Sequence, residues 1–373
     1  MAAETIFTTM TRLAVETGAV NLGQGFPDGG EPPALLDAAA AALHAGHNQY
    51  APLPGVPALR QAIADHQRRH YGIELDPDTE IQVTFGATEA IAAALLALVR
   101  PSDEVAMLDP SYDSYRAIVE LAGGIAVPIV LQPPDWRVPS ADLIGPQTRV
   151  LLLNTPHNPT GRVLDAAELE LLCTACREHD VTLVTDEVYE HLVFDGKHLP
   201  PSTLPGMAER TLTISSLGKT HSVTGWKIGW VSGPAELVGK VRGVKQFLTF
   251  AGGTPLQHAA AAGLALDEDA AALAASLRER RDRLAAGLTE AGFGVLPTAG
   301  TYFLNADCRP LGEADAAALS LRLPREAGVV AIPLSAFSAA PTPHTNALLR
   351  FAFCKRTDVL DEGIARLMAW RHG

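Results

Sequence analysis

The sequence predicts an α/β protein with a mostly parallel sheet that helices cover on both faces. Short apolar, β-branched runs alternate with Ala- and Leu-rich helical segments through the middle of the chain, a pattern typical of strand–helix–strand units. The 373 residues, 47% of them hydrophobic, suffice for a large domain with a sizeable core and a smaller companion. The unusual polar motifs also follow these runs, where open α/β sheets bind their ligands.

Seven runs have the length and composition of buried strands: residues 80–85, 104–109, 125–130, 149–154, 181–186, 210–215 and 227–232. The helical segments between them include residues 166–179, an amphipathic pattern that contains Cys173 and Cys176. These two thiols have the CxxC spacing, but no second pair or suitably spaced histidine accompanies them. We therefore expect both thiols to pack in the core.

After Thr249 the sequence predicts a second unit, of the α+β type. A long helical stretch covers residues 256–292, and short strand candidates follow near 301–307, 329–333 and 348–354. Residues 338–346 are rich in Pro and Ala and are expected to form a solvated surface loop.

Charge and composition argue against several classes of function. A net charge of −13 disfavours nonspecific binding to nucleic acid or anionic membranes, because a field of that sign repels phosphates. Four cysteines do not make a disulfide framework, and the first residues lack the basic start and apolar core of a signal peptide. No uncharged run reaches the roughly 18 residues of a transmembrane helix. We expect a cytoplasmic protein without a nucleic-acid or membrane partner.

Lys219 lies in Gly218-Lys219-Thr220, which has the letters that end a phosphate-binding P-loop. A P-loop requires a glycine five residues before the Gly-Lys pair, and that position is Thr213. The nucleotide-binding interpretation therefore fails. What remains is a lysine between two apolar runs, with Lys227 eight residues further on, and two such lysines indicate an anionic partner.

Two polar motifs follow predicted strands in the first half of the chain. Gly86-Ala87-Thr88 opens a helix whose free N–H groups attract phosphate, although small residues also begin many ordinary helices. Asn158 lies in a Pro-rich turn after residues 149–154, which would present its amide from a fixed backbone, although turn structure alone also explains the motif.

Asp186 ends the predicted strand at 181–186, and Tyr189 follows three residues later. A carboxylate that closes a buried strand is costly unless it caps a helix or meets a cation or a hydrogen-bond donor. Together, the strand ends offer a phosphate cradle, an amide, a carboxylate, a phenol and a lysine to one ligand. Pyridoxal 5′-phosphate (PLP) requires that set, with Lys219 for its aldehyde and Lys227 for its phosphate.

In this order the motifs resemble those of the fold-type I aminotransferases of classes I and II. The resemblance runs through "NLGQGFPDG", "NQYAPLPGVPALR", "GATEA", "DPSYDSY", "NTPHNPTG", "TDEVYEHLVFDG", "SSLGKTHSVTGWKIGW", "GTYF" and "LLRFAFCK". The chain is most similar to the subgroup of kynurenine, glutamine and methionine aminotransferases and N-succinyldiaminopimelate aminotransferases. The resemblance implies the type I PLP-transferase fold with a seven-stranded sheet, a large domain over 30–260, and a small α+β domain from 1–29 plus 261–373.

The resemblance also implies roles for individual residues around the cofactor. Lys219 would form the Schiff base with PLP and move the substrate α-proton, with Asp186 on the pyridine nitrogen and Tyr189 on the phenolic oxygen. Further cofactor contacts would come from Gly86, Ala87, Thr88, Tyr112, Asn158, Ser216, Lys227 and, from a second subunit, Tyr50. No metal ion is implied.

On the substrate side, the resemblance implies that Arg350 binds the α-carboxylate in a bidentate pair, with the Gly25 backbone and the Asn158 amide. The active site would be shared across a homodimer. The predicted function is a PLP-dependent aminotransferase that moves an amino group from an L-amino acid to 2-oxoglutarate or pyruvate by a ping-pong mechanism. The expected donor is of the methionine, glutamine or aromatic type, or N-succinyl-LL-diaminopimelate.

Two other functions remain open at this stage. A cysteine-S-conjugate β-lyase would use the same residues and cofactor to expel a β-substituent. A catalytically silent regulator with this fold is disfavoured, because the charge is acidic, no DNA-binding domain is appended and every catalytic position is filled. The small residues Ala251-Gly252-Gly253 stand where similar proteins carry bulkier or polar ones, which indicates room for a larger substrate side chain.

Overall fold

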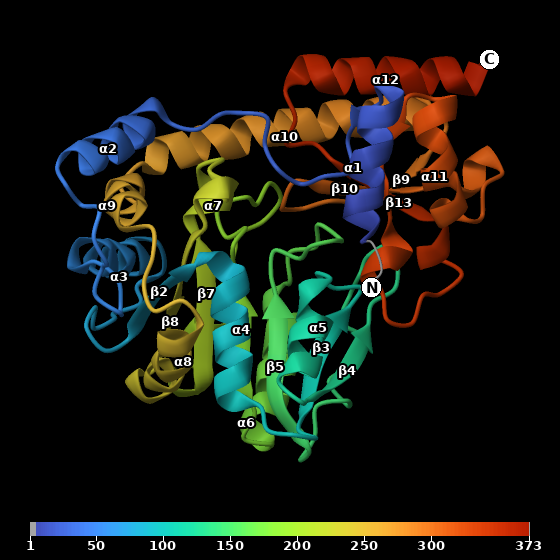
Figure 1. Ribbon diagram of the computed structural model, residues 1–373. Coiled ribbons are helices and arrows are strands. Elements are labelled where there is room, and N and C mark those ends of the chain that lie inside the picture. The colour runs from blue at the N-terminus through green and yellow to red at the C-terminus, as the bar shows by residue number, and fades with distance from the viewer. Residues whose placement is uncertain (1–4, 373) are drawn as a thin grey trace.

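The structure, a computed structural model, describes residues 5–372 and contains a central seven-stranded sheet (Figure 1). In spatial order its strands are β2 (Ile81–Phe85), β8 (Ile228–Ser232), β7 (Thr211–Ser216), β6 (Thr182–Asp186), β5 (Thr148–Asn154), β3 (Glu104–Asp109) and β4 (Ile125–Val130). The pairs among β7, β6, β5, β3 and β4 are parallel, whereas β8 runs antiparallel to both β7 and β2. All seven predicted strands are present, with ends shifted by no more than one residue.

Helices cover both faces of this sheet, as the alternating sequence pattern predicts. One face packs against α4 (Gly86–Leu98), α5 (Ser114–Leu121) and α8 (Ala235–Leu248), which share one cluster of buried residues. The opposite face packs against α6 (Ala166–Glu178), and the same cluster of buried residues extends to α1 (Ile6–Thr17). Cys173 and Cys176 of α6 are fully buried and unpaired in that second cluster, which confirms their predicted role in packing.

The β2 edge of the sheet is covered by three further helices, α2 (Pro33–His44), α3 (Pro57–Tyr71) and α9 (Thr254–Gly263). The predicted helical stretch 256–292 is divided here, because α9 ends at Gly263 and α10 (Asp267–Glu290) begins only at Asp267. Three acidic residues in the first turn of α10 interact favourably with its helix dipole and mark the new start.

The remaining elements form the second, smaller unit that the sequence predicts. Its antiparallel sheet has the order β12 (Ile332–Pro333), β13 (Leu348–Ala352), β10 (Phe303–Asp307) and β9 (Gly294–Val295), and β1 (Val20–Asn21) pairs in parallel with β11 (Val329–Val330). The helices α10, α11 (Ala316–Glu326) and α12 (Thr357–His372) pack around these strands with α1 (Figure 1). We keep the division into 30–260 and 1–29 plus 261–373 as a proposal; residues 1–4 and 373 lie outside the described residues, and α9 crosses the boundary at 260.

The Pro- and Ala-rich segment 338–346 is more than a solvated connection. The Ser338 hydroxyl donates to Asp109 Oδ1, and the Ala339 N–H donates to Asp109 Oδ2 over 2.6 Å. Since Asp109 is only 2% exposed at the end of β3, these contacts attach the small unit to the central sheet. No helix of the described chain combines the length and the apolar composition that crossing a lipid bilayer requires.

Candidate active site

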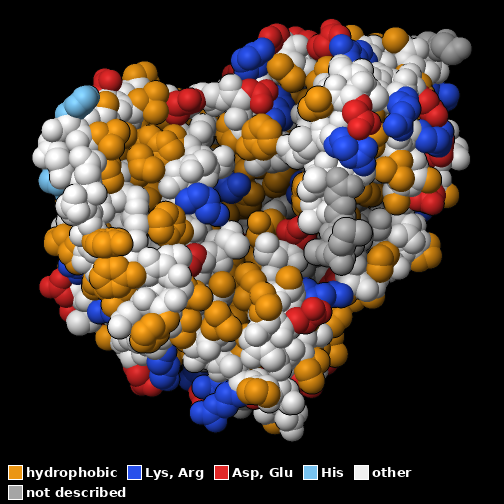
Figure 2. Space-filling model, in the orientation of Figure 1, with side chains coloured by type: hydrophobic (Ala, Val, Ile, Leu, Met, Phe, Trp, Pro, Cys, Tyr) orange, Lys and Arg blue, Asp and Glu red, His pale blue; other side chains and the backbone are white. Residues whose placement is uncertain are grey.

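A cavity of about 360 Å³ opens at the carboxyl ends of the parallel strands, between the central sheet and the smaller unit. Figure 2 shows the molecule hollowed near the middle of this face. Its lining includes twelve of the thirteen residues that the sequence singles out: Gly25, Gly86, Ala87, Thr88, Tyr112, Asn158, Asp186, Tyr189, Ser216, Lys219, Lys227 and Arg350. Residues up to 325 positions apart in the chain therefore meet in one place, as the strand-end argument predicts.

Lys219 lies in α7 (Leu217–Thr220), the single helical turn that directly follows β7. Its ammonium donates a hydrogen bond to the Tyr302 hydroxyl over 2.8 Å, and Tyr302 in turn donates to the Gly25 carbonyl over 2.6 Å. Burial lowers the pKa of Lys219 to about 8, although Asp186 acts in the opposite direction. Roughly a tenth to a fifth of this amine is therefore neutral near physiological pH, far more than for an ordinary lysine, and the neutral amine is the state that attacks a carbonyl carbon.

Asp186 ends β6 and points into the same cavity while only 5% of it is exposed. The Tyr115 hydroxyl donates to its Oδ2 over 2.6 Å, and the Val188 N–H donates to its Oδ1 over 3.3 Å. Burial raises the pKa of Asp186 to about 6, and the bond from Tyr115 limits that rise. Keeping this buried carboxyl group ionised therefore costs free energy, and a cationic ligand group would stabilise the charge.

In cofactor-free protein, Asp186→Asn is expected to remove a pH-dependent loss of stability. Because the pKa in the folded state is about 6, above the usual 3.8, the folded protein binds a proton that the unfolded chain has released between these values. The free energy of unfolding therefore falls as pH rises through this window, by up to about 3 kcal/mol from this group. Urea unfolding at pH 5 and pH 7 checks this: the variant should gain on the wild type at pH 7, and an equal difference at both pH values would contradict it.

The start of α4 forms a cradle for an anion. Gly86 has a φ of 68°, and a Cβ placed there would lie 3.4 Å from both Cε and Nζ of Lys227. Gly229 of β8 permits this close approach, because its own Cβ would lie 2.5 Å from the Gly86 carbonyl carbon. The lysine ammonium therefore lies beside the N–H groups at the helix start, where a phosphate binds favourably. Ser216 and Thr224 line the same part of the cavity.

Asn158 is held in place from below by Asn154, at the end of β5. Asn154 accepts a hydrogen bond from the Asn158 N–H over 2.7 Å and donates one to the Asp186 carbonyl over 2.8 Å. Tyr189 is 3% exposed and its ring stands edge-on to that of Tyr302, with the centroids 5.3 Å apart. Backbone and aromatic packing thus fix the amide and the phenol that the sequence predicts at this site.

Arg350, in β13, brings a buried guanidinium to the cavity from the small unit, and only 2% of the residue is exposed. Its hydrogen-bond acceptors are neutral, Asn158 Oδ1 at 2.9 Å and the Gly23 carbonyl at 3.2 Å, and its Nε has no partner among the described residues. Burial lowers the pKa of Arg350 to about 10, so it stays charged at neutral pH. A buried cation with neutral partners indicates a site for an anionic ligand group.

Two aromatic rings pack against the guanidinium of Arg350, which lines the cavity. The guanidinium carbon lies 3.8 Å from the centre of the Phe303 ring and 4.3 Å from that of Phe337. Phe303 also explains why position 25 is a glycine, because a Cβ at this position would lie 2.3 Å from the Phe303 ring. Only glycine allows the backbone at position 25 to pass this close to the rings of Phe303 and Tyr302.

Tyr50 does not line the cavity of its own chain but is 83% exposed, with its ring 5.8 Å from that of Phe250, so its contact with the cofactor of a second subunit stays a prediction. One sequence interpretation looks different in the structure. The small residue Gly252 does not leave room for a substrate, because a Cβ there would lie 1.8 Å from the Phe85 ring, and Phe85 occupies the space. The interpretation of residues 251–253 as extra space in the pocket therefore finds no support in this chain.

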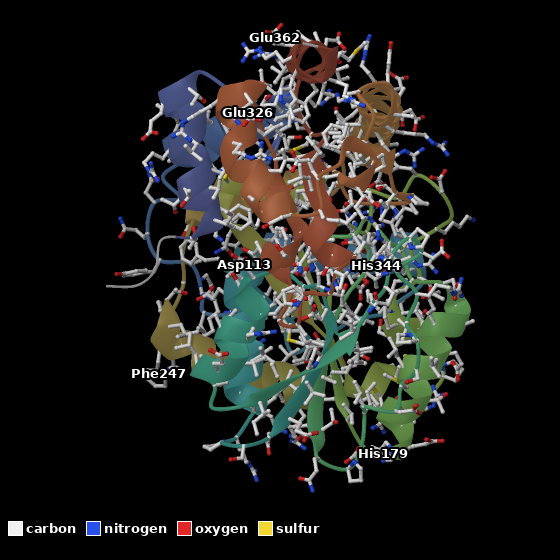
Figure 3. The ribbon with its side chains drawn as sticks, turned by 90° about the vertical axis from the view of Figure 1, so that its right-hand side faces the viewer. Asp113, His179, Phe247, Glu326, His344 and Glu362 are labelled. Carbon is white, nitrogen blue, oxygen red and sulfur yellow. The ribbon has the colours of Figure 1, made fainter. Side chains whose placement is uncertain are left out.

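Sequence reasoning missed several cavity residues. The Tyr115 hydroxyl of α5 donates a hydrogen bond to Asp186, and the residue could have been found, because it ends the motif "DPSYDSY", three positions after Tyr112. Phe7, Asp113 and Phe303 also line the cavity; Asp113 and Phe303 lie within the motifs "DPSYDSY" and "GTYF", whereas nothing in the sequence around Phe7 distinguishes it from a residue of the core. Figure 3 shows Asp113 at the start of α5, beneath the elements of the small unit.

Residues 17–367 match the family of the class I and II aminotransferases. The chain belongs to this family, and it is therefore an enzyme of the transaminase class. A probable N-succinyldiaminopimelate aminotransferase of Mycobacterium tuberculosis is 53% identical, over 98% of this chain and 96% of that protein. The methionine aminotransferase of Escherichia coli is 44% identical, over 97% of this chain and 95% of that protein.

Similarity to solved structures extends over the whole fold. The structure of N-succinyldiaminopimelate aminotransferase from Mycobacterium tuberculosis matches with a TM-score of 0.95 at 52% identity, covering 99% of this chain and 97% of the other. The predicted family and the type I fold, with its seven-stranded sheet and small α+β unit, are thereby confirmed.

Proposed function

We propose that this aminotransferase uses PLP, bound in the cavity described above, to move an amino group from an L-amino acid to a 2-oxo acid in two half-reactions. The observation that carries the proposal is that a lysine with a lowered pKa, Lys219, meets a buried carboxylate and a buried arginine, Asp186 and Arg350, in one cavity. None of the three would be stable there without ligand groups of complementary charge or reactivity.

The residues present fit PLP. Gly86, Lys227 and the start of α4 would hold its phosphate, and the Asp186 carboxylate would hold its ring nitrogen in the protonated form. When bound, PLP supplies an electron sink for the electrons released at the substrate Cα. Asn158 and Tyr189 would donate hydrogen bonds to its phenolic oxygen, while Tyr112 would lie against the ring.

Lys219 has the properties that a nucleophile and proton carrier requires. With a pKa of about 8, its amine can both accept and return the substrate α-proton near neutral pH. Tyr302 accepts its hydrogen bond and is itself anchored on the Gly25 carbonyl, so the amine has a defined direction before the substrate arrives. Arg350 would bind the α-carboxylate through Nε, which has no partner among the described residues, and through N–H groups of Nη1 and Nη2 that do not face Asn158 or Gly23, and would orient the Cα–H bond toward the lysine.

We propose N-succinyl-LL-diaminopimelate as the donor, with methionine as the second candidate, because the two relatives described above carry these names. The test is to measure kcat/KM for N-succinyl-LL-diaminopimelate, methionine, glutamine, kynurenine and glutamate, each with 2-oxoglutarate or pyruvate as acceptor. The proposal predicts the highest value for the succinylated donor. A higher value for methionine or kynurenine would move the enzyme to the other subgroups.

The same panel separates transamination from β-elimination. A cysteine conjugate supplied without any 2-oxo acid should release little pyruvate and ammonia if transamination is the main reaction. Continuous pyruvate formation under those conditions, faster than amino transfer to 2-oxoglutarate, would assign the enzyme to the lyases instead.

We further propose that the enzyme works in the cytoplasm as a homodimer. Four buried, unpaired cysteines are compatible with a reducing compartment. Large hydrophobic side chains are exposed at neighbouring positions of the chain, Phe247, Leu248 and Phe250, and at Tyr50, whose ring contacts that of Phe250; Phe247 is 85% exposed, and Figure 3 shows it pointing outward from α8. Such a patch favours burial against a second copy, and Tyr50 from that patch would then reach the phosphate of the other subunit.

Phe247→Asp is therefore expected to shift the enzyme from dimer to monomer, because the carboxylate would be buried at the contact without a partner. The molar mass measured by light scattering during size exclusion should fall by half at micromolar protein concentration, and the affinity for PLP should fall with it. Leu321→Asp, at a residue 45% exposed on α11, is the matched control and should leave the mass unchanged. A Phe247→Asp protein that keeps the mass of the wild type would contradict the proposed contact.

A further inference from the structure

Three histidines lie together outside the cavity described above. His66 and His70 are one helical turn apart on α3, and His191 follows β6 by five residues. One nitrogen atom from each of the three rings lies within 4.8 Å of the others, and the ring centroids are 4.6, 5.0 and 4.8 Å apart. The Nε2 atoms of His66 and His191 are separated by 2.7 Å.

We propose that His66, His70 and His191 bind a transition-metal cation of the zinc class. Imidazole nitrogen is a preferred ligand of Zn²⁺, with bonds of about 2.0–2.1 Å. Two ligands of a tetrahedral ion are therefore about 3.3 Å apart. Separating the Nε2 atoms of His66 and His191 by about half an ångström and drawing His70 inward would satisfy this spacing.

Negative charge around the three rings favours a cation. The Asp267 carboxylate, at the start of α10, lies 3.1 Å from His70 Nε2 and is the nearest oxygen donor for a fourth position. A second, small cavity is lined by His66 and His191 and also by Glu190, which is 5% exposed and accepts a hydrogen bond from Ser215 over 2.6 Å. Arg69 already pairs with Asp267 at 2.7 Å, so the imidazoles remain the main ligands.

The burial of the rings suits an ion that enters from one side. His66 is only 3% exposed, whereas the His70 side chain keeps 26% of its surface and faces solvent. His221 lines the same small cavity, is 3% exposed, and its Nδ1 has no partner among the described residues. At least one buried imidazole nitrogen atom near the three histidines is therefore not engaged in a hydrogen bond.

A bound ion would link three segments that surround the active site. It would join α3 to the loop that carries Tyr189, two residues before His191, and to the start of α10. The small cavity also touches Leu217 and Thr220, which flank Lys219. We infer a structural role: the ion would stabilise the back of the catalytic site and raise the melting temperature.

The test uses the holoenzyme without a polyhistidine tag, treated with a chelator and titrated with Zn²⁺ by calorimetry and with Co²⁺ by absorption. The expected result is one ion per chain, Co²⁺ bands at wavelengths beyond those of the cofactor, and a melting temperature raised by several degrees. His70→Ala should weaken binding at least about tenfold, since it removes one ligand. His191→Ala is the second variant, and both should fold because neither residue is fully buried.

His179→Ala is the matched control, because His179 lies at the end of α6, at the lower edge of the molecule in Figure 3. It should bind both ions as the wild type does. Equal binding by the wild type and His70→Ala, or no binding by the wild type at micromolar Zn²⁺, would overturn the proposal. The contact between His66 and His191 would then be an ordinary hydrogen bond between α3 and the loop.

Discussion

Lys219→Ala is expected to lower turnover by roughly 10⁴-fold, the upper end of what a positioned acid/base contributes, because the variant loses both the attacking amine and the proton carrier. The protein should still fold: the lysine donates a single hydrogen bond, to Tyr302, which keeps its own bond to the Gly25 carbonyl. PLP should bind without a covalent link, through Lys227 and the start of α4. Steady-state kinetics, thermal melting and cofactor content together check these expectations.

Lys227→Ala is the control, since it removes the other lysine of the same cavity. Its position beside Gly86 predicts weaker PLP binding, with turnover kept within about tenfold once PLP is saturating. If Lys219→Ala retained more than a tenth of the wild-type turnover, or if Lys227→Ala were the more severe variant at saturating PLP, the assignment of the two lysines would be wrong.

Arg350→Met is expected to lower kcat/KM for amino acids by about 10²–10³-fold, which corresponds to the loss of a buried charge pair with the substrate carboxylate. The melting temperature should change by only a few degrees. The variant loses hydrogen bonds to Asn158 and Gly23, but it also removes a buried cation whose protein acceptors are neutral. This combination of poor activity and retained stability distinguishes a ligand-binding arginine from one that holds the fold together.

The control for this prediction is a substrate rather than a second protein. The primary amine that lacks the α-carboxylate of the donor should react poorly with the wild type, and Arg350→Met should lower its rate much less than that of the amino acid. Arg350→Lys should recover only part of the activity, because an ammonium cannot form the bidentate pair. Equal losses for the amine and the amino acid would show that Arg350 acts through the structure instead.

Six strands of the central sheet could be predicted because their side chains are mostly buried on both faces, and the edge strand β4, whose Ile125 is 52% exposed, could be predicted from its β-branched residues. A buried parallel strand reads as a continuous apolar run, and all seven such runs form strands within one residue of their predicted ends. The ligand site could be predicted from the same pattern, because polar residues that end parallel strands meet at one edge. Asn158, Asp186 and Lys219 follow three neighbouring strands, and all three line the cavity.

The partners of these residues depend on tertiary packing and were harder to predict. The sequence shows that Asp186 needs a partner, but the Tyr115 hydroxyl comes from a helix 71 positions away in the chain. Tyr302 supports Lys219 only because the small unit folds over the sheet. Position 252 is a glycine because the Phe85 ring occupies the space that a side chain would need, and no sequence pattern reveals this contact.

The sequence pattern also does not predict where a helix ends or what a loop contacts within polar or Ala-rich segments. The stretch 256–292 has helical composition throughout, yet it is interrupted after Gly263, where Arg69 donates to the Leu264 carbonyl and pairs with Asp267. Likewise, the composition of residues 338–346 indicates a loop but not its contact with Asp109. In both places the decisive interaction comes from a distant part of the chain.

The most direct test of the central claim is to reduce the holoenzyme with borohydride and locate the modified residue by peptide mass spectrometry. Reduction makes any bond between PLP and a lysine permanent. The structure predicts one pyridoxyl group per chain, on Lys219. Burial lowers the pKa of this amine to about 8, and Lys219 lines the cavity. A pyridoxyl group on Lys227 or on another lysine, or a protein that takes up no PLP at all, would contradict the account.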